Sequence, residues 1–110
     1  MEFTVEHEPG YTVLVGTGRL NMVRAPKLRE VVAEVVAAGH HHLVLDMTGI
    51  EFVDSSGLGA LVGCLKAARQ AGGDLRIANA GPQVRMVLEL TGMDRVFTPY
   101  GSVDQAFPGG

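Results

Sequence analysis

Residues 43–59 read L-V-L-D-M-T-G-I-E-F-V-D-S-S-G-L-G and contain a strand, a loop and the beginning of a helix. The first four residues form an apolar run that ends in Asp46, which is typical of a strand buried on both faces. Ser55 and Ser56 are good helix N-caps, and the apolar residues after them recur at helical spacing. The stretch therefore predicts half of a βαβ unit, with residues 54–57 at the carboxyl end of the strand, where open α/β sheets bind their ligands.

The length and composition of the chain favour one small domain. It has 110 residues, 46% of them hydrophobic, and we expect a domain over residues 1–107 with residues 108–110 as a frayed tail. The net charge of -3 leaves no basic stripe, so nucleic acid is not expected as a direct partner. No apolar run reaches the ~18 residues of a membrane span, and the N-terminus lacks the features of a signal peptide. We therefore expect a cytoplasmic protein with no membrane partner.

Strands and helices are expected to alternate along the chain. Pro9 and Gly10 form a turn signal between the apolar residues 3–6 and 11–15, and they predict an antiparallel hairpin at one edge of the sheet. The other predicted elements are a helix over residues 25–38, a strand over 74–78, a helix over 82–91, a strand over 96–98 and a closing helix over 102–107 capped by Ser102. With right-handed crossovers, this order predicts a single α/β domain whose mixed, mainly parallel sheet has about five strands and about four helices.

The sequence offers little of what catalysis needs, and we expect the protein not to be an enzyme. Ser55 lies beside Asp54, but no histidine follows the serine and no G-x-S-x-G elbow surrounds it. Asp46 stands at a strand end, as an aspartyl-phosphate nucleophile would, but the second acid that such a site has two residues further on is replaced by Thr48. We therefore expect Asp46 to accept hydrogen bonds from loop amides. The glycines within residues 16–18 and 57–63 miss the dinucleotide-binding spacing, so no cofactor is expected.

The histidines and the cysteine do not predict a metal site. Residues 40–42 are three consecutive histidines, and on a strand their side chains would point to alternate sides. No second cluster of ligands stands at a fixed spacing from them, so we interpret them as a polar turn. Cys64 is the single cysteine, and its place in an apolar helical pattern predicts a small buried side chain.

Three segments in order carry a family resemblance: F-V-D-S-S-G-L-G-A-L at residues 52–61, G-G-D-L-R-I at 72–77 and L-E-L-T-G-M-D-R-V-F at 88–97. The chain resembles the anti-sigma factor antagonists of bacteria, the small STAS domains, closely over about its last two-thirds and loosely over the first third. The resemblance implies a regulator of transcription that works by partner switching, for example in a stress response. In this family the unphosphorylated antagonist binds an anti-sigma factor that is also a serine kinase, and the sigma factor is freed.

The resemblance also implies which residues carry this function. Carried to the matching position, Ser55 is the phosphorylation site. The loop that the partner recognises comprises Asp54, Ser56, Gly57 and Leu58. Many relatives read G-E-L-D before the first helix, whereas residues 18–21 read G-R-L-N here: Asn21 loses a negative charge and Arg19 adds a positive one. We expect this segment to border the serine loop and its altered charge to change the choice of kinase or the rate of phosphorylation. A phosphoserine phosphatase is the second implied partner, and a weak homodimer is left open.

Phosphorylation of Ser55 would act without refolding. A hydroxyl at a helix N-terminus lies near free amides and the positive end of the helix dipole, so its own domain tolerates a phosphate there. The phosphate adds about -1.5 to -2 of charge beside Asp54, and a partner that covers the loop must desolvate this charge. Two alternatives stay open: a STAS scaffold in another signalling complex, and a module that holds a nucleotide or another anion at the helix N-terminus.

Overall fold

The strands of the computed structural model, which describes residues 3–107, form one sheet in the order β1-β2-β3-β4-β5. Their bounds are Thr4–Glu8, Tyr11–Leu20, His42–Val53, Asp74–Ala78 and Pro99–Tyr100. Only the β1–β2 pair is antiparallel, and Gly10 takes a φ of 88° in its turn. The predicted α/β fold with an antiparallel edge hairpin is therefore confirmed, while the predicted tail of residues 108–110 lies outside the described residues.

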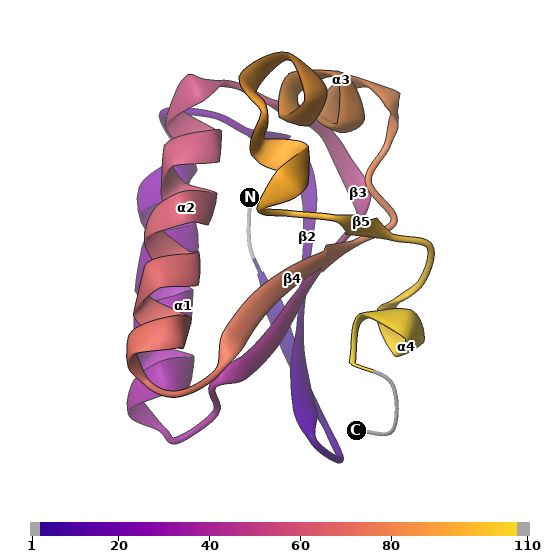
Figure 1. Cartoon of the computed structure of the whole chain (residues 1–110). Helices are drawn as coiled ribbons and strands as arrows, with labels where there is room; N and C mark the ends of the chain where they lie inside the picture. The colour runs from indigo at the N-terminus through magenta and orange to yellow at the C-terminus, as the bar shows by residue number, and fades with distance from the viewer. Residues whose placement is uncertain (1–2, 108–110) are drawn as a thin grey trace.

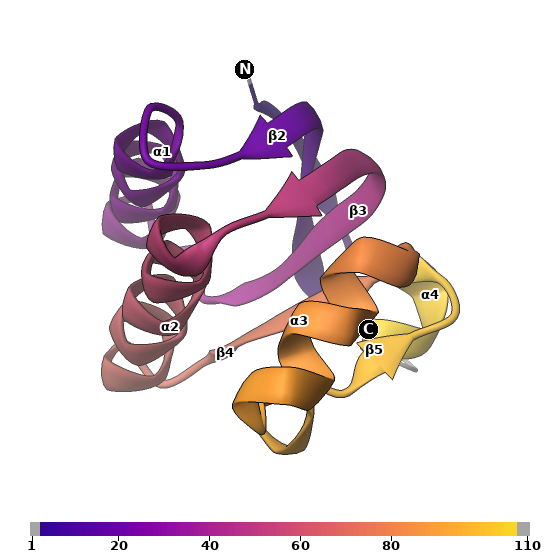
Figure 2. The same cartoon turned by 90° about the horizontal axis from the view of Figure 1, so that it is seen from above.

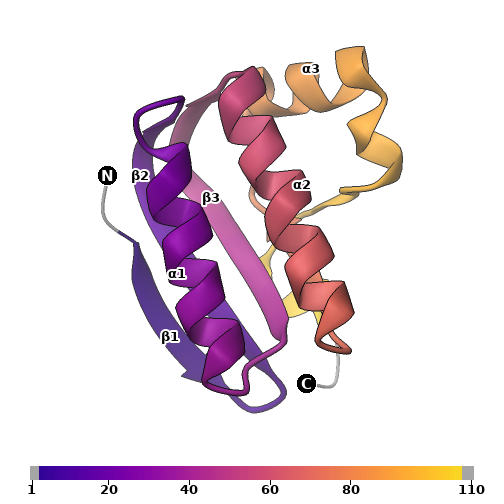
Figure 3. The ribbon, with the colours of Figure 1, turned by 90° about the vertical axis from the view of Figure 1, so that its left-hand side faces the viewer.

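The helices lie on both faces of this sheet. Their bounds are Ala25–Ala37 for α1, Ser55–Gln70 for α2, Pro82–Thr91 for α3 and Val103–Ala106 for α4, with a 3-10 turn, η1, over Met93–Arg95. Figure 3 shows α1 and α2 side by side across one face. In Figure 1 the short helix α4 lies on the opposite side of the sheet, and α3 lies at its upper end. Both long helices therefore begin near the carboxyl ends of the parallel strands.

The core is divided by the sheet into a large and a small cluster. The large cluster joins the sheet to α1, α2 and α3, whereas the small one joins Val13, Val44 and Ala78 to Ala106 and Phe107 at α4. Consecutive residues of β3 enter different clusters because side chains alternate across a strand. This explains why residues 43–45 are all fully buried, as their unbroken apolar run predicts.

Two predicted boundaries are wrong. The loop expected after Asp46 is strand, because β3 continues to Val53 and pairs with the second half of β2 across two register shifts. The last strand is not residues 96–98 but Pro99–Tyr100. Phe97 is only 1% exposed, and the turn of η1 delivers it into the large core cluster. Burial of this aromatic ring therefore overrides the strand propensity of its neighbours.

Candidate functional site

The end of β3 is held from both sides just before the serine loop. On one side Val53 pairs with Leu20 of β2, and the amide of Asp54 donates to the carbonyl of Leu20 at 3.4 Å. On the other side β4 no longer accompanies β3, and the Gln83 side chain takes its place. Gln83 Oε1 accepts from the amide of Val53 at 2.9 Å, and its Nε2 donates to the carbonyl of Val53 at 3.0 Å. Helix α3 therefore fixes the residue that precedes Asp54 and Ser55.

Gly57 brings the start of α2 against the end of β2. A Cβ atom at this position would lie 2.1 Å from the carbonyl oxygen of Leu20, which no real side chain tolerates. Only glycine permits this approach of the two backbones. The start of α2 therefore lies against the end of β2, which Asn21 directly follows, and the partner contact expected of Asn21 stays a prediction.

Asp54, rather than a serine, is the N-cap of α2. Its Oδ1 accepts from the amide of Gly57 at 2.8 Å, and its carbonyl accepts from the amide of Leu58 at 2.9 Å. The prediction that Ser55 or Ser56 caps the helix is wrong, because aspartate is an equally good cap and stands one residue earlier. Ser55 is instead the first helical residue and is exposed, while Ser56 is half-buried. The predicted serine loop of residues 54–58 is therefore the N-cap and the first turn of α2.

Asn21 shapes the turn between β2 and α1. Its Oδ1 accepts from the amides of Val23 and Arg24 at 3.1 and 3.3 Å. Its carbonyl also accepts from the amide of Ala25 at 2.8 Å. Asparagine accepts these bonds without a charge, so the turn does not require an aspartate at this position. Met22 and Val23, directly after it, are highly exposed apolar residues at the same end of the sheet.

An apolar groove runs from the serine loop between α2 and α3, two helices whose arrangement Figure 2 shows from above. Its volume is about 480 Å³. It is lined by Val53, Asp54, Ser55, Leu58, Gly59, Val62, Val87, Thr91 and Met93. The sequence analysis missed this groove, because no local pattern reports how far apart two helices lie. Its one signal was that α2 and α3 carry more apolar residues than their buried stripes need.

Asp46 lies away from the serine loop and accepts hydrogen bonds, as predicted. Its Oδ1 accepts from the amide and hydroxyl of Thr48 at 3.1 and 2.6 Å and from Nδ2 of Asn79 at 3.0 Å. Desolvation by burial raises the pKa of this carboxyl, but the bonds from Thr48 and Asn79 together outweigh it. The pKa of Asp46 is therefore lowered from its ordinary value.

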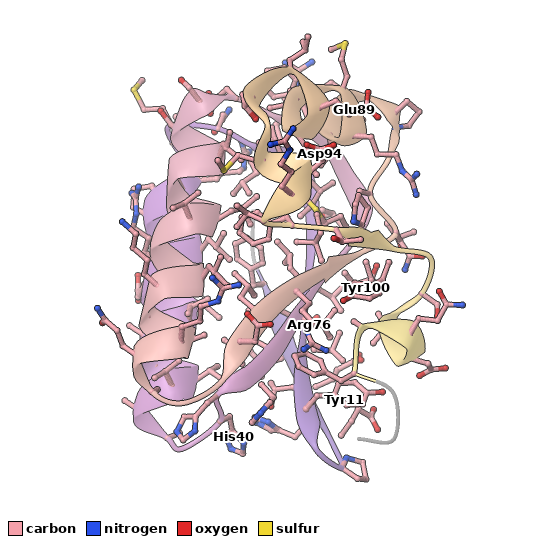
Figure 4. The ribbon with its side chains drawn as sticks, viewed as in Figure 1. Tyr11, His40, Arg76, Glu89, Asp94 and Tyr100 are labelled. Atoms are coloured by element: carbon pink, nitrogen blue, oxygen red, sulfur yellow. The ribbon has the colours of Figure 1, made fainter. Side chains whose placement is uncertain are left out.

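The histidines gather at the other end of the sheet. Figure 4 labels His40 at the end remote from α3, and its ring stacks on that of His7 with centroids 4.1 Å apart. No three histidine, cysteine or acidic side chains within residues 3–107 are arranged to hold a metal ion. Cys64 is buried between α1 and α2, as predicted, and burial raises the pKa of its thiol to about 11.

Comparison with known proteins places the chain beside bacterial regulators. The family model described as the STAS domain matches residues 2–106. The anti-sigma-B factor antagonist of Staphylococcus epidermidis is 32% identical over 90 residues, which are 82% of each chain. The crystal structure of an anti-sigma factor antagonist from Mycobacterium paratuberculosis is 33% identical, with a TM-score of 0.83 over 94% of this chain and 88% of that one.

The fold itself recurs in a third protein, from Thermotoga maritima. Its crystal structure superposes with a TM-score of 0.87 at 27% identity, over 94% of this chain and 90% of that one. Among the helices of residues 3–107, none combines the length and hydropathy that a bilayer span requires. The serine loop, the Gln83 contact and the groove all lie within residues 2–106, which the STAS family model matches.

Proposed function

The chain belongs to the STAS domain family, and on this premise we propose that it is an anti-sigma factor antagonist. In its unphosphorylated form it binds an anti-sigma factor with serine kinase activity, and the sigma factor is released. Phosphorylation of Ser55 ends the complex, and a phosphoserine phosphatase restores it. The relatives named as anti-sigma factor antagonists support the general assignment.

The position of Ser55 is the observation that carries the proposal. The residue is exposed and is the first residue of α2. The carboxylate of Asp54, the N-cap directly before it, accepts a hydrogen bond from the amide of Gly57. A kinase can therefore reach the hydroxyl without opening the fold. The neighbouring carboxylate of Asp54 is engaged as the cap of α2, and His7 and His40 lie together at the other end of the sheet (Figure 4). The serine is therefore suited to be a substrate rather than a catalyst.

A phosphate on Ser55 has opposite effects on the domain and on its partner. The free amides and the dipole at the start of α2 favour negative charge, so the domain keeps its fold. A partner that covers the loop must remove water from about two negative charges beside Asp54. We expect the affinity to fall roughly hundredfold, which corresponds to about 2.7 kcal/mol.

The test compares the two states of Ser55 directly. The probe is the purified anti-sigma factor kinase of the same bacterium, titrated with and without ATP. We expect Ser55→Asp to weaken the complex roughly hundredfold and Ser55→Ala to bind equally well in both conditions. Ser102→Asp is the matched control, because Ser102 caps the distant helix α4 and aspartate preserves that cap. Equal affinity of Ser55→Asp and Ser55→Ala for the kinase would contradict the proposed phosphorylation switch.

The alternative that the N-terminus of α2 holds a nucleotide or another anion competes with the cap, because the amide of Gly57 already donates to Asp54. Calorimetry with nucleotides on the unmodified domain tests it, and micromolar binding would favour it. A STAS scaffold whose serine is never modified is the other alternative. Incubation with the kinase and ATP, followed by mass mapping, distinguishes it, because a scaffold gains no phosphate on Ser55.

A further inference from the structure

We propose that Gln83 is a positioning residue for the phosphorylation of Ser55: its side chain fixes the end of β3 and so sets where the serine hydroxyl lies. This inference rests on the proposed function, because it concerns the same reaction. Ser55 lies in the first turn of a folded helix, so a kinase must meet its hydroxyl where the fold holds it. Group transfer is sensitive to such placement, and a displacement of about 1 Å can lower the rate roughly hundredfold.

The side chain of Gln83 bonds to β3 as a neighbouring strand would. Strand β4 pairs with β3 only as far as Asp46, whereas β3 continues to Val53. There the amide of Val53 donates to Oε1 of Gln83 at 2.9 Å, and Nε2 of Gln83 donates to the carbonyl of Val53 at 3.0 Å. An amide only donates and a carbonyl only accepts, so the two bonds fix the orientation of the glutamine side chain. Because Val53 is only 2% exposed, its two polar groups depend on Gln83 for their hydrogen bonds.

The hydrogen bond that holds this end of β3 from the other side is longer. The amide of Asp54 donates to the carbonyl of Leu20 at 3.4 Å, whereas ordinary N–H···O bonds measure about 2.9–3.0 Å. The α3 side therefore contributes two bonds of ordinary length, both to the residue that directly precedes Asp54. The position of Ser55 thus depends on α3 as well as on β2.

The turn that leads into α3 is itself anchored to the sheet. Asn79, the residue after β4, has a φ of 60°, a left-handed conformation that asparagine adopts more readily than most residues. Its Nδ2 donates to Oδ1 of Asp46 at 3.0 Å, and its amide donates to the carbonyl of Tyr100 at 2.9 Å. The turn is therefore tied to both β3 and β5, and Gln83 reaches β3 from a fixed helix start.

The experiment measures steady-state phosphorylation by the purified anti-sigma factor kinase of the same bacterium, with the domain as the varied substrate. Gln83→Leu keeps an apolar side chain of similar length and removes both hydrogen bonds. Gln83→Glu keeps an acceptor for the amide of Val53 but loses the donor to its carbonyl. The controls are Gln70→Leu, at an exposed glutamine that ends α2, and Gly73→Ala, which crowds the carbonyl of His41 at the other end of the sheet. Rates are expressed per folded molecule, with the folded fraction taken from urea titration.

We expect both Gln83 variants to lower kcat roughly tenfold and to change KM less than about twofold, because the kinase still recognises the surface but meets a displaced hydroxyl. Asn79→Gly keeps the left-handed turn and loses the bond to Asp46, so its kcat should fall less than that of Gln83→Leu. Per folded molecule, Gln70→Leu and Gly73→Ala should keep the kcat and KM of the wild type. This split separates positioning from a loss of stability.

The outcomes distinguish this inference from the proposed function. If the wild type is phosphorylated on Ser55 and both Gln83 variants keep its kcat, the positioning role is wrong and the proposed function stands. If the wild type gains no phosphate on Ser55, the proposed function is wrong and this inference fails with it. A raised KM at unchanged kcat would place Gln83 in the surface that binds the kinase, which would also overturn the positioning role. Should Gln83→Leu unfold, Gln83→Glu and Asn79→Gly decide.

Discussion

At each end of the parallel part of the sheet a glycine packs closely against a backbone carbonyl, but only one of the two ends has the features of a functional site. At the carboxyl end Gly57 packs against the carbonyl of Leu20, and at the amino end Gly73 packs against the carbonyl of His41. A Cβ atom would lie 2.1 Å from the oxygen in the first case and 2.0 Å in the second. Close backbone approach through glycine is therefore a property of the fold, and it does not by itself mark a functional site.

What differs between the ends is what surrounds the glycine. The carboxyl end holds the N-termini of α1 and α2, an exposed serine and an apolar groove. The amino end holds the C-termini of the same helices, which are followed by Gly39 and Gly72 with φ of 97° and 91°, and a small hollow lined in part by residues 40–42, which are histidines. Helix N-termini favour negative charge and C-termini disfavour it, so only the carboxyl end suits a phosphate.

Alanine at the two glycines should separate stability from function. We expect Gly57→Ala and Gly73→Ala each to lower the free energy of unfolding by about 3 kcal/mol, because a backbone carbonyl must move to admit the methyl group. Urea titration measures this loss. Only Gly57→Ala should also slow phosphorylation of Ser55, since it displaces the start of α2.

The comparison of rates is made on the folded fraction of each variant. If Gly73→Ala slowed the phosphorylation of Ser55 as much as Gly57→Ala does, the effect would follow from lost stability alone. The distinction between the two ends of the sheet would then have no functional meaning.

Gln83 should be the next most sensitive position. Gln83→Ala removes both hydrogen bonds to the backbone of buried Val53, and we expect a loss of roughly 2 kcal/mol together with slower phosphorylation of Ser55. Hydrogen exchange at the amide of Val53 should accelerate. The matched control is Gln70→Ala, an exposed glutamine at the amino end of the sheet. Unchanged exchange at Val53 would show that the Gln83 contact does not hold the strand.

The N-cap of α2 should have a smaller effect. We expect Asp54→Ala to lower the free energy of unfolding by about 1 kcal/mol, because the amide of Gly57 loses its acceptor. Asp54→Asn retains a capping oxygen and should restore most of the stability. Thermal unfolding of the two variants measures the difference, and equal melting temperatures would contradict the capping role.

Local signals in the sequence predicted the helices and strands, whereas contacts between residues far apart in the sequence could not be predicted. Pro82 and Gly92 bound α3 as predicted, since proline and glycine act through their own backbone. The continuation of β3 to Val53 depends instead on pairing with β2, and the role of Gln83 joins positions 30 residues apart. The assignment of Ser55 rested on a family resemblance. The structure adds its exposure and the groove beside it, which no spacing of residues encodes.

Asp46, between the two ends of the sheet, should give the smallest effect and one that depends on pH. Its folded-state pKa lies below the ordinary value of about 3.9, so its stabilising contribution is complete above that pH and is lost as the pH falls through the folded pKa. We expect Asp46→Asn to be less stable than the wild type at pH 7 and the difference to shrink below about pH 4. In the background of Thr48→Val, which lacks the hydroxyl that donates to Asp46 at 2.6 Å, this pH dependence should weaken. Urea titrations across this pH range measure it, and a difference that grows toward low pH would reverse the assigned direction, because it would mean that the fold favours the protonated carboxyl.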